Sequence, residues 1–255
     1  DYAVTGVQTC ALPIYNQALA ELIADDVATL AWSLRSFLSQ PLPKPDEAVK
    51  QALDLVRQGV RPVVLADGAD RTGDSTHLLK ELLAQKAMNF AIPGIADPIV
   101  ARELEQTAQI GDFVTVSVGG WASEHSGTPV QVSGVVQFIG RPNFTLVGPM
   151  GRGSKVQDGL VVRLKLGANN HVVISERMRG SNDSAGLTAV GIDVSSLDLV
   201  ILKDRVHHRA FWDTVAQADI RVDAPGIGTA DLSTLHYDNI PKDIFPIGQR
   251  SAVQT

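Results

Sequence analysis

The spacing of hydrophobic residues changes several times along the chain. At residues 16–39, apolar positions recur every three or four residues, which is typical of an amphipathic helix. Prolines at positions 41, 43 and 45 end this pattern, and a second helix is predicted at about residues 46–58. Short apolar runs at 62–66 and 90–95 then predict buried strands, each followed by a helical pattern.

The middle of the chain has the two-residue period of β-strands. Apolar and polar residues alternate at 114–118, 130–138 and 162–166, and turn residues at 167–170 precede a strand at 172–174. These strands are expected to be antiparallel, with one face toward solvent. Strand, helix and strand are predicted again at 197–202, 208–217 and 220–222, before a Pro- and Gly-rich end. The pattern predicts a mixed α/β fold: a partly parallel sheet with flanking helices, plus an antiparallel β-hairpin region.

Composition narrows the class of protein. The 255 residues include 22 Lys and Arg against 28 Asp and Glu, a net charge of −6, so no basic surface for nucleic acid or an anionic membrane is expected. No apolar run approaches the roughly 18–20 residues of a membrane span. The single cysteine can form neither an internal disulfide nor a thiolate zinc site. We therefore expect a cytoplasmic protein without nucleic-acid or membrane partners.

The first residues differ from the rest of the chain. Residues 4–14, VTGVQTCALPI, resemble the translation of a common sequencing adapter and have neither helical nor strand periodicity. A signal peptide is the alternative, but its basic start and continuous apolar core are absent. We therefore interpret residues 1–14 as an adapter-derived artefact and assign no function to Cys10.

The loop at residues 67–76 is the first candidate site. It lies between a predicted strand and a predicted helix, where open α/β sheets place their ligand crevices. Gly68 and Gly73 allow unusual backbone angles, and the start of the helix attracts anions or carbonyl oxygens. Turn formation and helix capping are an equally good interpretation of this loop. The candidate side chains are those of Asp67, Asp70, Arg71, Asp74, Ser75 and Thr76.

A second candidate loop, GGWASEHSG at residues 119–127, joins two predicted strands and is longer than a hairpin requires. Gly119, Gly120 and His125 are its candidates for contact with a ligand. An exposed hairpin tip is the favoured alternative, because neighbours in sequence need not bring a ring and a carboxylate together.

The third candidate segment, KDRVHHR at residues 203–209, follows a predicted strand. His207 and His208 would point about 100° apart on a helix, so they cannot chelate one metal ion as histidines four residues apart do. His207 with Arg209 is the candidate pair beside a crevice, and one packed plus one solvated histidine is the alternative.

No complete catalytic motif accompanies these loops. The metalloprotease, nucleophile-elbow, dinucleotide-binding and P-loop patterns are all absent, and no spacing indicates a metal site. The site residues predicted from chemistry therefore include no metal ligand and no complete catalytic set.

An ordered series of sequence blocks points to a family. Within residues 63–247 the chain contains, in this order, VVLADGADRTGDSTHLLKELL, IPGIADP, VTVSVGG, VGPMGRGSKVQDG, LVILKDRVHHRAFW and VDAPGIGTADLSTLHYDNIPKDIFPI. This series resembles the C-terminal domain of the MlrC (microcystinase C) family of zinc metallopeptidases. The resemblance implies a hydrolase in which zinc activates water to attack a peptide carbonyl, with small peptides as substrates.

The resemblance also implies a division of the chain. Residues 15–45 would be a helical remnant of a missing N-terminal domain with its linker, and residues 46–255 the C-terminal domain. Because the zinc ligands of the family lie in the N-terminal domain, no metal is expected in this fragment, which should be inactive alone. Its partners would be the peptide substrate and the missing domain, with the candidate residues lining one wall of a cleft.

Residues 121–126 differ from the lysine-bearing form of this loop in the family, which leaves the substrate class undetermined.

Two other functions stay open. A non-catalytic α/β module that binds a small ligand or a partner is the first alternative. An anion-binding hydrolase acting through Asp67, Asp70 and His125 is the second.

Overall fold

The computed structural model describes residues 16–167, 169–241 and 244–247. The predicted artefact at residues 1–14 lies outside this range. The chain divides into two units, one of Asp1–Pro41 with Pro241–Thr255 and one of Leu42–Ile240. In the described ranges, no helix combines the length and the apolar character needed to cross a membrane.

The first unit contains a helix that is interrupted once. α2 (Gln17–Ser33) begins at Asn16, whose side chain accepts a hydrogen bond from the backbone N–H of Leu19 at 3.1 Å. A turn separates it from α3 (Arg35–Leu38), so the single helix predicted at 16–39 is two helices. Much of the predicted apolar stripe is exposed: Leu22, Leu30 and Phe37 expose 59, 61 and 73% of their surface.

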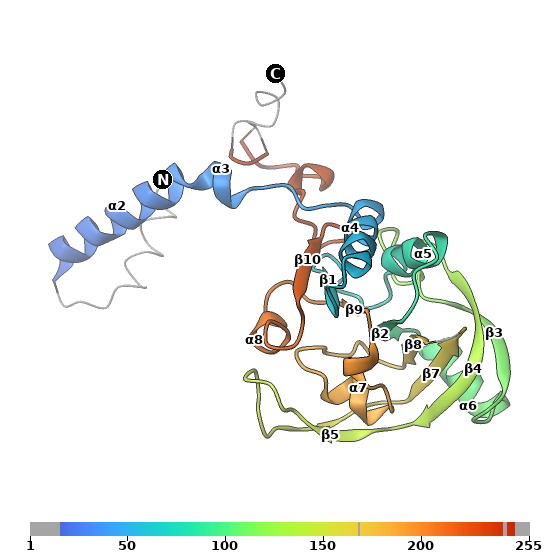
Figure 1. The fold of residues 1–255 in the computed structure, drawn as a ribbon. Coiled ribbons are helices and arrows are strands. Elements are labelled where there is room, and N and C mark those ends of the chain that lie inside the picture. The colour runs from blue at the N-terminus through green and yellow to red at the C-terminus, as the bar shows by residue number, and fades with distance from the viewer. Residues whose placement is uncertain (1–15, 168, 242–243, 248–255) are drawn as a thin grey trace. The chain divides into compact units, whose positions relative to one another are not determined.

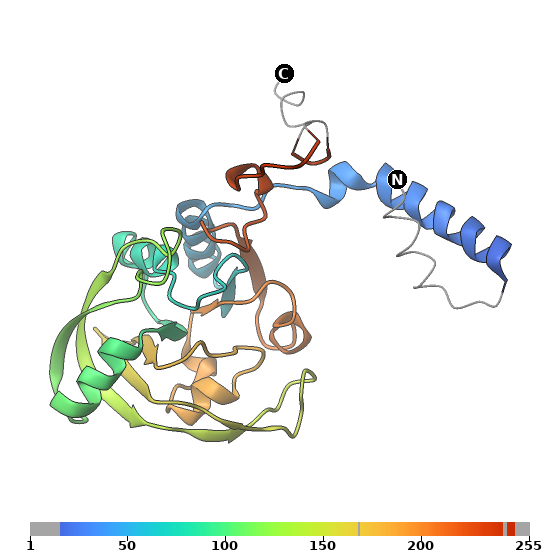
Figure 2. The ribbon, with the colours of Figure 1, turned by 180° about the vertical axis from the view of Figure 1, so that it is seen from behind.

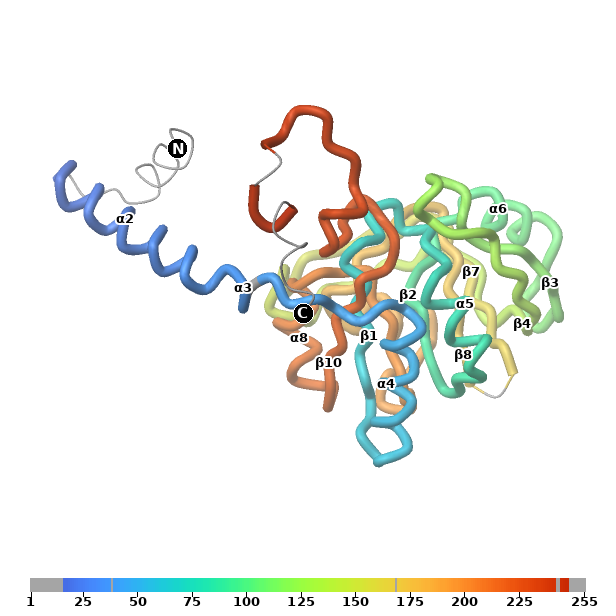
Figure 3. Tube along the Cα trace, turned by 90° about the horizontal axis from the view of Figure 1, so that it is seen from above, coloured from blue at the N-terminus to red at the C-terminus, as the bar shows by residue number. Residues whose placement is uncertain are grey.

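The second unit is built on an eight-stranded sheet in the order β10-β1-β9-β2-β8-β7-β4-β3. The first five strands in this order are parallel to one another. They are β10 (Ala218–Val222), β1 (Val63–Asp67), β9 (Leu199–Leu202), β2 (Phe90–Ala96) and β8 (Asn170–Ser175). The other three pair antiparallel: β7 (Val161–Leu166), β4 (Val130–Gly140) and β3 (Phe113–Val118). Seen from above, β3 and β4 lie at the opposite end of the row of strands from β10 (Figure 3).

Helices lie on both faces of this sheet, as Figures 1 and 2 show from opposite sides. α4 (Pro45–Arg57), α5 (His77–Ala84) and α6 (Pro98–Thr107) pack on one face, and α7 (Ala185–Ala189) and α8 (Arg209–Trp212) on the other. Two short 3₁₀ helices (Val194–Ser196 and Leu232–Thr234) and a two-stranded sheet of β5 (Asn143–Thr145) and β6 (Lys155–Gln157) complete the described elements. The predicted mixed α/β class is confirmed.

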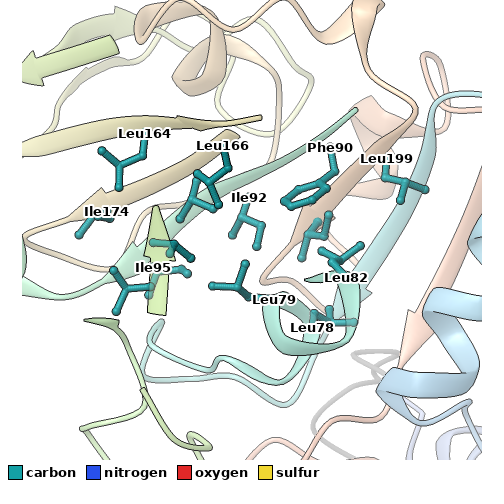
Figure 4. Packing of buried hydrophobic residues seen from close by; sticks show 14 of the residues in the cluster. Leu78, Leu79, Leu82, Phe90, Ile92, Ile95, Leu164, Leu166, Ile174 and Leu199 are labelled. Atoms are coloured by element: carbon teal, nitrogen blue, oxygen red, sulfur yellow. The ribbon is translucent and has the colours of Figure 1, made fainter. Parts of the chain in front are cut away.

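Alternate residues of β1 enter two separate hydrophobic clusters. Val63 and Leu65 of β1 join the cluster under α4, α5 and α6, whereas Val64 and Ala66 join the cluster that contains Trp212. Figure 4 shows the first cluster, in which leucines of α5 lie opposite the apolar side chains of β2. Because both faces of such a strand are buried, its sequence is a continuous run of apolar residues, as at 62–66.

Two further sequence predictions need correction. β7 was expected to have a solvated face, but Arg163 on that face is only 8% exposed and donates from Nη1 to the carbonyl of Gly191 at 2.6 Å. The strand is buried because it lies inside the sheet with elements on both sides. The helix predicted at 208–217 is also shorter, since α8 spans only Arg209–Trp212.

Candidate functional site

The candidate site lies at one edge of the sheet, where parallel strands end. Asp67 is the last residue of β1, Lys203 follows β9, and Asp97 follows β2. These three strands are neighbours in the order β1-β9-β2, so their carboxyl ends meet at the same edge. This is the edge at which open α/β sheets bind ligands.

A buried ion pair joins two of the loops at this edge. The carboxylate of Asp70 and the ammonium group of Lys203 are in contact, and their side chains are only 1 and 8% exposed. Lys203 Nζ also donates to the carbonyl of Ser75 at 3.0 Å. Burial alone would raise the pKa of Asp70, but the charge and hydrogen bond of Lys203 and the N–H groups of Gly73 and Ser75 hold this pKa below its ordinary value. Asp70 is therefore a fixed anion that orders the loop.

Asp67 is buried and interacts electrostatically with both members of this pair. Its Oδ1 accepts hydrogen bonds from the backbone N–H groups of Ala69 at 3.0 Å and Asp70 at 3.3 Å. Burial raises the pKa of Asp67, and the positive charge of Lys203 opposes that rise. Two carboxyl groups thus share one buried ammonium group, and Lys203 is the counter-charge for both.

Asp74 holds the second candidate loop against the first. Its Oδ2 accepts hydrogen bonds from the backbone N–H groups of Trp121 at 2.9 Å and Ala122 at 2.8 Å. Its Oδ1 accepts from Ser126 Oγ at 2.9 Å and from the hydroxyl of Thr72. These donors lower the pKa of Asp74 even though burial acts to raise it. The loop at 119–127 is therefore tied to the loop at 67–76.

Close backbone contact explains the paired glycines of this loop. Gly119 and Gly120 have φ values of +66° and +70°, which side chains with a Cβ rarely adopt. A Cβ at Gly119 would lie 2.5 Å from the carbonyl oxygen of Asp74, and one at Gly120 would lie 2.5 Å from the backbone carbon of Thr128. The N–H of Gly119 donates to Asp97 Oδ2 at 3.0 Å. Both glycines therefore allow the loops to approach each other.

Three loops line a small pocket beside these contacts. Residues from 69–75, 123–126 and 225–227 contribute, and the inner volume is about 10 Å³, room for about one water-sized group. Ser75 reaches this pocket, and its buried Oγ has no hydrogen-bond partner in the described chain. Thr76 does not line the pocket, and its hydroxyl donates to the carbonyl of Thr128 at 2.8 Å. Of the other candidates, Asp70, Arg71 and His125 also line the pocket.

His207 and Arg209 are not brought to this pocket. His207 is exposed, and Arg209 forms ion pairs with Asp213 at 3.0 Å and Asp219 at 3.7 Å. Arg209, but not His207, borders a separate open hollow beside β10, where Asp219 is in register with Val64 near the start of β1. Their role in a substrate site stays a prediction.

His208, which follows His207 in the sequence, is buried. His208 is fully buried, with Nδ1 3.2 Å from Asp204 Oδ1 and Nε2 3.3 Å from Asp219 Oδ1. Burial acts to lower its pKa, but the hydrogen bonds and charges of the two carboxylates prevail and raise this pKa to about 9. The structure therefore has one packed and one solvated histidine, the alternative interpretation of this segment.

This histidine predicts a pH dependence of stability. The pKa of His208 is about 9 in the folded chain and 6.5 ordinarily, so its stabilising contribution is complete below pH 6.5 and disappears as the pH rises through 9. The free energy of unfolding of the chain should therefore fall between pH 6.5 and pH 9 by more than that of a His208→Gln variant. Urea unfolding at several pH values measures this difference, and parallel profiles for the two proteins would contradict it.

Sequence reasoning missed three residues of the site. Lys203 neutralises Asp70, Asp97 binds the N–H of Gly119, and Ser126 connects the second loop to Asp74. Lys203 and Asp97 could have been found, because each directly follows an apolar strand, just as Asp67 ends one. Ser126 carries no signal of its own in the sequence.

The donor atoms at this edge do not form a metal site. Within the described ranges, no group of three or more His, Cys, Asp or Glu side chains is placed to hold a metal ion. The carboxylates of Asp70 and Asp74 instead accept hydrogen bonds from N–H, hydroxyl and ammonium groups. These carboxylates therefore hold the loops together through hydrogen bonds.

Comparison with known proteins finds a matching family and solved structures of similar fold. The family described as MlrC C-terminus matches residues 67–239, which include all three pocket-lining loops. The fold is similar to the crystal structure of a candidate metallopeptidase from Mesorhizobium sp. BNC1, with a TM-score of 0.74 and 22% sequence identity. The match covers 87% of this chain and 44% of that one, so the chain spans less than half the length of that protein. No curated protein matches the chain.

Proposed function

The chain belongs to the family of the MlrC C-terminus, and from this premise we propose that it supplies the substrate-binding wall of a peptide-hydrolysing enzyme. The observation that carries the proposal is the pocket at the carboxyl edge of the sheet, with the unpartnered hydroxyl of Ser75 in its lining. The description of the Mesorhizobium protein as a candidate metallopeptidase agrees with this class of activity.

In this proposal the described residues bind and orient the substrate. The ion pair of Asp70 and Lys203 fixes the backbone of Ser75, because Asp70 accepts its N–H and Lys203 donates to its carbonyl. Asp74 fixes the opposite wall through Trp121 and Ala122. Asp70, Lys203 and Asp74 are thus positioning residues, whereas Ser75 would touch the substrate. Preorganised walls of this kind reduce the entropy lost when a substrate binds.

The metal belongs to another part of the protein in this proposal. The family resemblance implies zinc, and we propose that its ligands lie in an N-terminal domain, of which residues 15–45 are a remnant. The chain alone would then be inactive, and its candidate partners are that domain and a small peptide. A non-catalytic ligand-binding module is the alternative, and the experiment below distinguishes the two.

Recovery of the natural reading frame upstream of residue 15 provides the test. The encoded full-length protein and the 255-residue chain should be compared for zinc content and for hydrolysis of small peptides. Zinc and hydrolysis are expected only in the full-length protein. Stoichiometric zinc and hydrolysis with the chain alone, or an upstream region unrelated to a hydrolase, would refute the proposal.

The positioning role of Asp74 predicts a kinetic effect in the same full-length protein. Asp74→Asn removes the charge that attracts the N–H groups of Trp121 and Ala122, so the pocket wall should loosen. We expect kcat/KM to fall by about tenfold, the equivalent of one charged hydrogen bond, with zinc content unchanged. A proportional loss of zinc would instead place Asp74 in metal binding.

A further inference from the structure

The pocket at the carboxyl edge contains a serine hydroxyl that can donate a hydrogen bond to a ligand oxygen. Ser75 is 7% exposed, and both its backbone groups are engaged, the N–H by Asp70 at 3.0 Å and the carbonyl by Lys203 at 3.0 Å. Only its hydroxyl has no partner among the described residues, and that hydroxyl is buried in the pocket lining. An unpartnered buried hydroxyl costs free energy unless a ligand or a water molecule satisfies it.

The carboxylates near the pocket are already satisfied. Asp70 accepts from Lys203 and from three backbone N–H groups, those of Thr72, Gly73 and Ser75. Asp74 accepts from two hydroxyl groups and two backbone N–H groups. Neither carboxylate is therefore available as the main partner of a cationic ligand.

One charge in the pocket lining is unmatched. Arg71 is exposed, and its guanidinium has neither a hydrogen bond nor an ion pair with any residue of the described chain. Lys203 is neutralised by Asp70, and the His125 ring lies 3.7 Å from the Glu124 carboxylate. The free positive charge at the pocket is thus that of Arg71.

The size of the pocket limits what enters it. An inner volume of about 10 Å³ accommodates one oxygen-sized group and not a side chain. A carboxylate meets these conditions, because one of its oxygens can accept from a buried hydroxyl while its charge pairs with a guanidinium at the surface.

We propose that Ser75 and Arg71 bind a carboxylate group of the peptide substrate, supplied either by the C-terminus or by an acidic side chain. That the ligand is a peptide follows from the proposed function, on which this inference rests. That the bound group is a carboxylate follows from the pocket itself. It makes Ser75 and Arg71 specificity-determining residues, which favour substrates that carry a free carboxylate at the bound position.

Calorimetric titration of the 255-residue chain tests the proposal without any peptidase activity. The probes are an acetylated tri-alanine with a free C-terminal acid, its C-terminal amide, and the amide with one alanine replaced by glutamate. The acid, the glutamate peptide or both should bind, and the plain amide should bind at least about tenfold more weakly. Which of the first two binds identifies the source of the carboxylate. Equal affinity for acid and plain amide, or preference for an amine such as butylamine, would overturn the proposal.

Variants assign the binding to the two residues. Ser75→Ala and Arg71→Gln should each weaken binding of the acid by about tenfold, because each removes one contact to a charged group. Arg152→Gln, which changes an exposed arginine outside the pocket, is the matched control and should have no effect. Ser75→Ala should keep or raise the melting temperature of the chain, since its Oγ has no partner to lose among the described residues. Unchanged affinity in both pocket variants would also overturn the proposal.

The outcome is separable from that of the proposed function. Carboxylate binding by the chain together with a full-length protein that hydrolyses no peptide would refute the proposed function and leave this site standing. Peptide hydrolysis by the full-length protein, without any preference of the chain for a carboxylate, would refute this site and leave the proposed function standing.

Discussion

Replacement of Lys203 by methionine is expected to lower the free energy of unfolding of the chain by about 3–5 kcal/mol. Methionine fills much of the space of the lysine stem but leaves Asp70, whose side chain is 1% exposed, without its counter-charge. Asp67 also loses the only cation among the groups that shift its pKa. An uncompensated buried carboxylate is costly, and its pKa should rise until it is protonated. Urea unfolding at pH 7 measures the loss.

The double variant separates charge from packing. If the loss arises from the unpaired charge, Asp70→Asn combined with Lys203→Met should recover part of it, because no anion is then left without a partner. The stability of Lys203→Met should also improve as the pH falls toward the raised pKa of Asp70. A loss below about 1 kcal/mol for Lys203→Met, or a double variant that is simply additive, would show that the ion pair does not hold the loops.

Alanine at Gly119 should cost about 2–5 kcal/mol, for two reasons that can be measured separately. The φ of +66° strains any residue with a Cβ, at about 1–2 kcal/mol. The new Cβ would also lie 2.5 Å from the carbonyl oxygen of Asp74 and 2.8 Å from the methyl group of Thr76, so the two loops would have to separate. Thermal and urea unfolding of the variant give the total.

Gly153 is the matched control for this variant. Its φ is +84°, and a Cβ there would meet nothing within 4 Å, so Gly153→Ala shows the backbone strain alone. The excess loss in Gly119→Ala measures the close approach of the loops, and we expect it to reach at least about 1 kcal/mol. Equal losses for the two variants would mean that the second loop can move away from Asp74 at little cost.

The elements of the fold were largely predictable because hydrophobic periodicity is local. The apolar run before Asp67 and the alternation at 130–138 predicted β1 and β4 from a few residues each. The prediction of a solvated face for β7 was wrong because side-chain burial, unlike periodicity, is not a local property. Whether Arg163 is exposed depends on the elements that cover the sheet, and those lie far away in the sequence.

The candidate site was predictable only in part. The loop after β1 could be recognised from its place between strand and helix, but its counter-charge could not, since Lys203 is 133 residues from Asp70. That pairing follows from the strand order, which places β9 next to β1, and periodicity gives no strand order. The choice between His207 and His208 likewise depends on Asp204 and Asp219, which approach from different elements.

A crystal structure of the full-length protein with a bound peptide that ends in a free carboxylate tests the central claim most directly. The account predicts that the carboxylate contacts Ser75 and Arg71, and that the metal is held by side chains from outside residues 16–247. A metal ion ligated by the aspartates and histidines of this chain, or a peptide bound away from the carboxyl edge of the sheet, would contradict it.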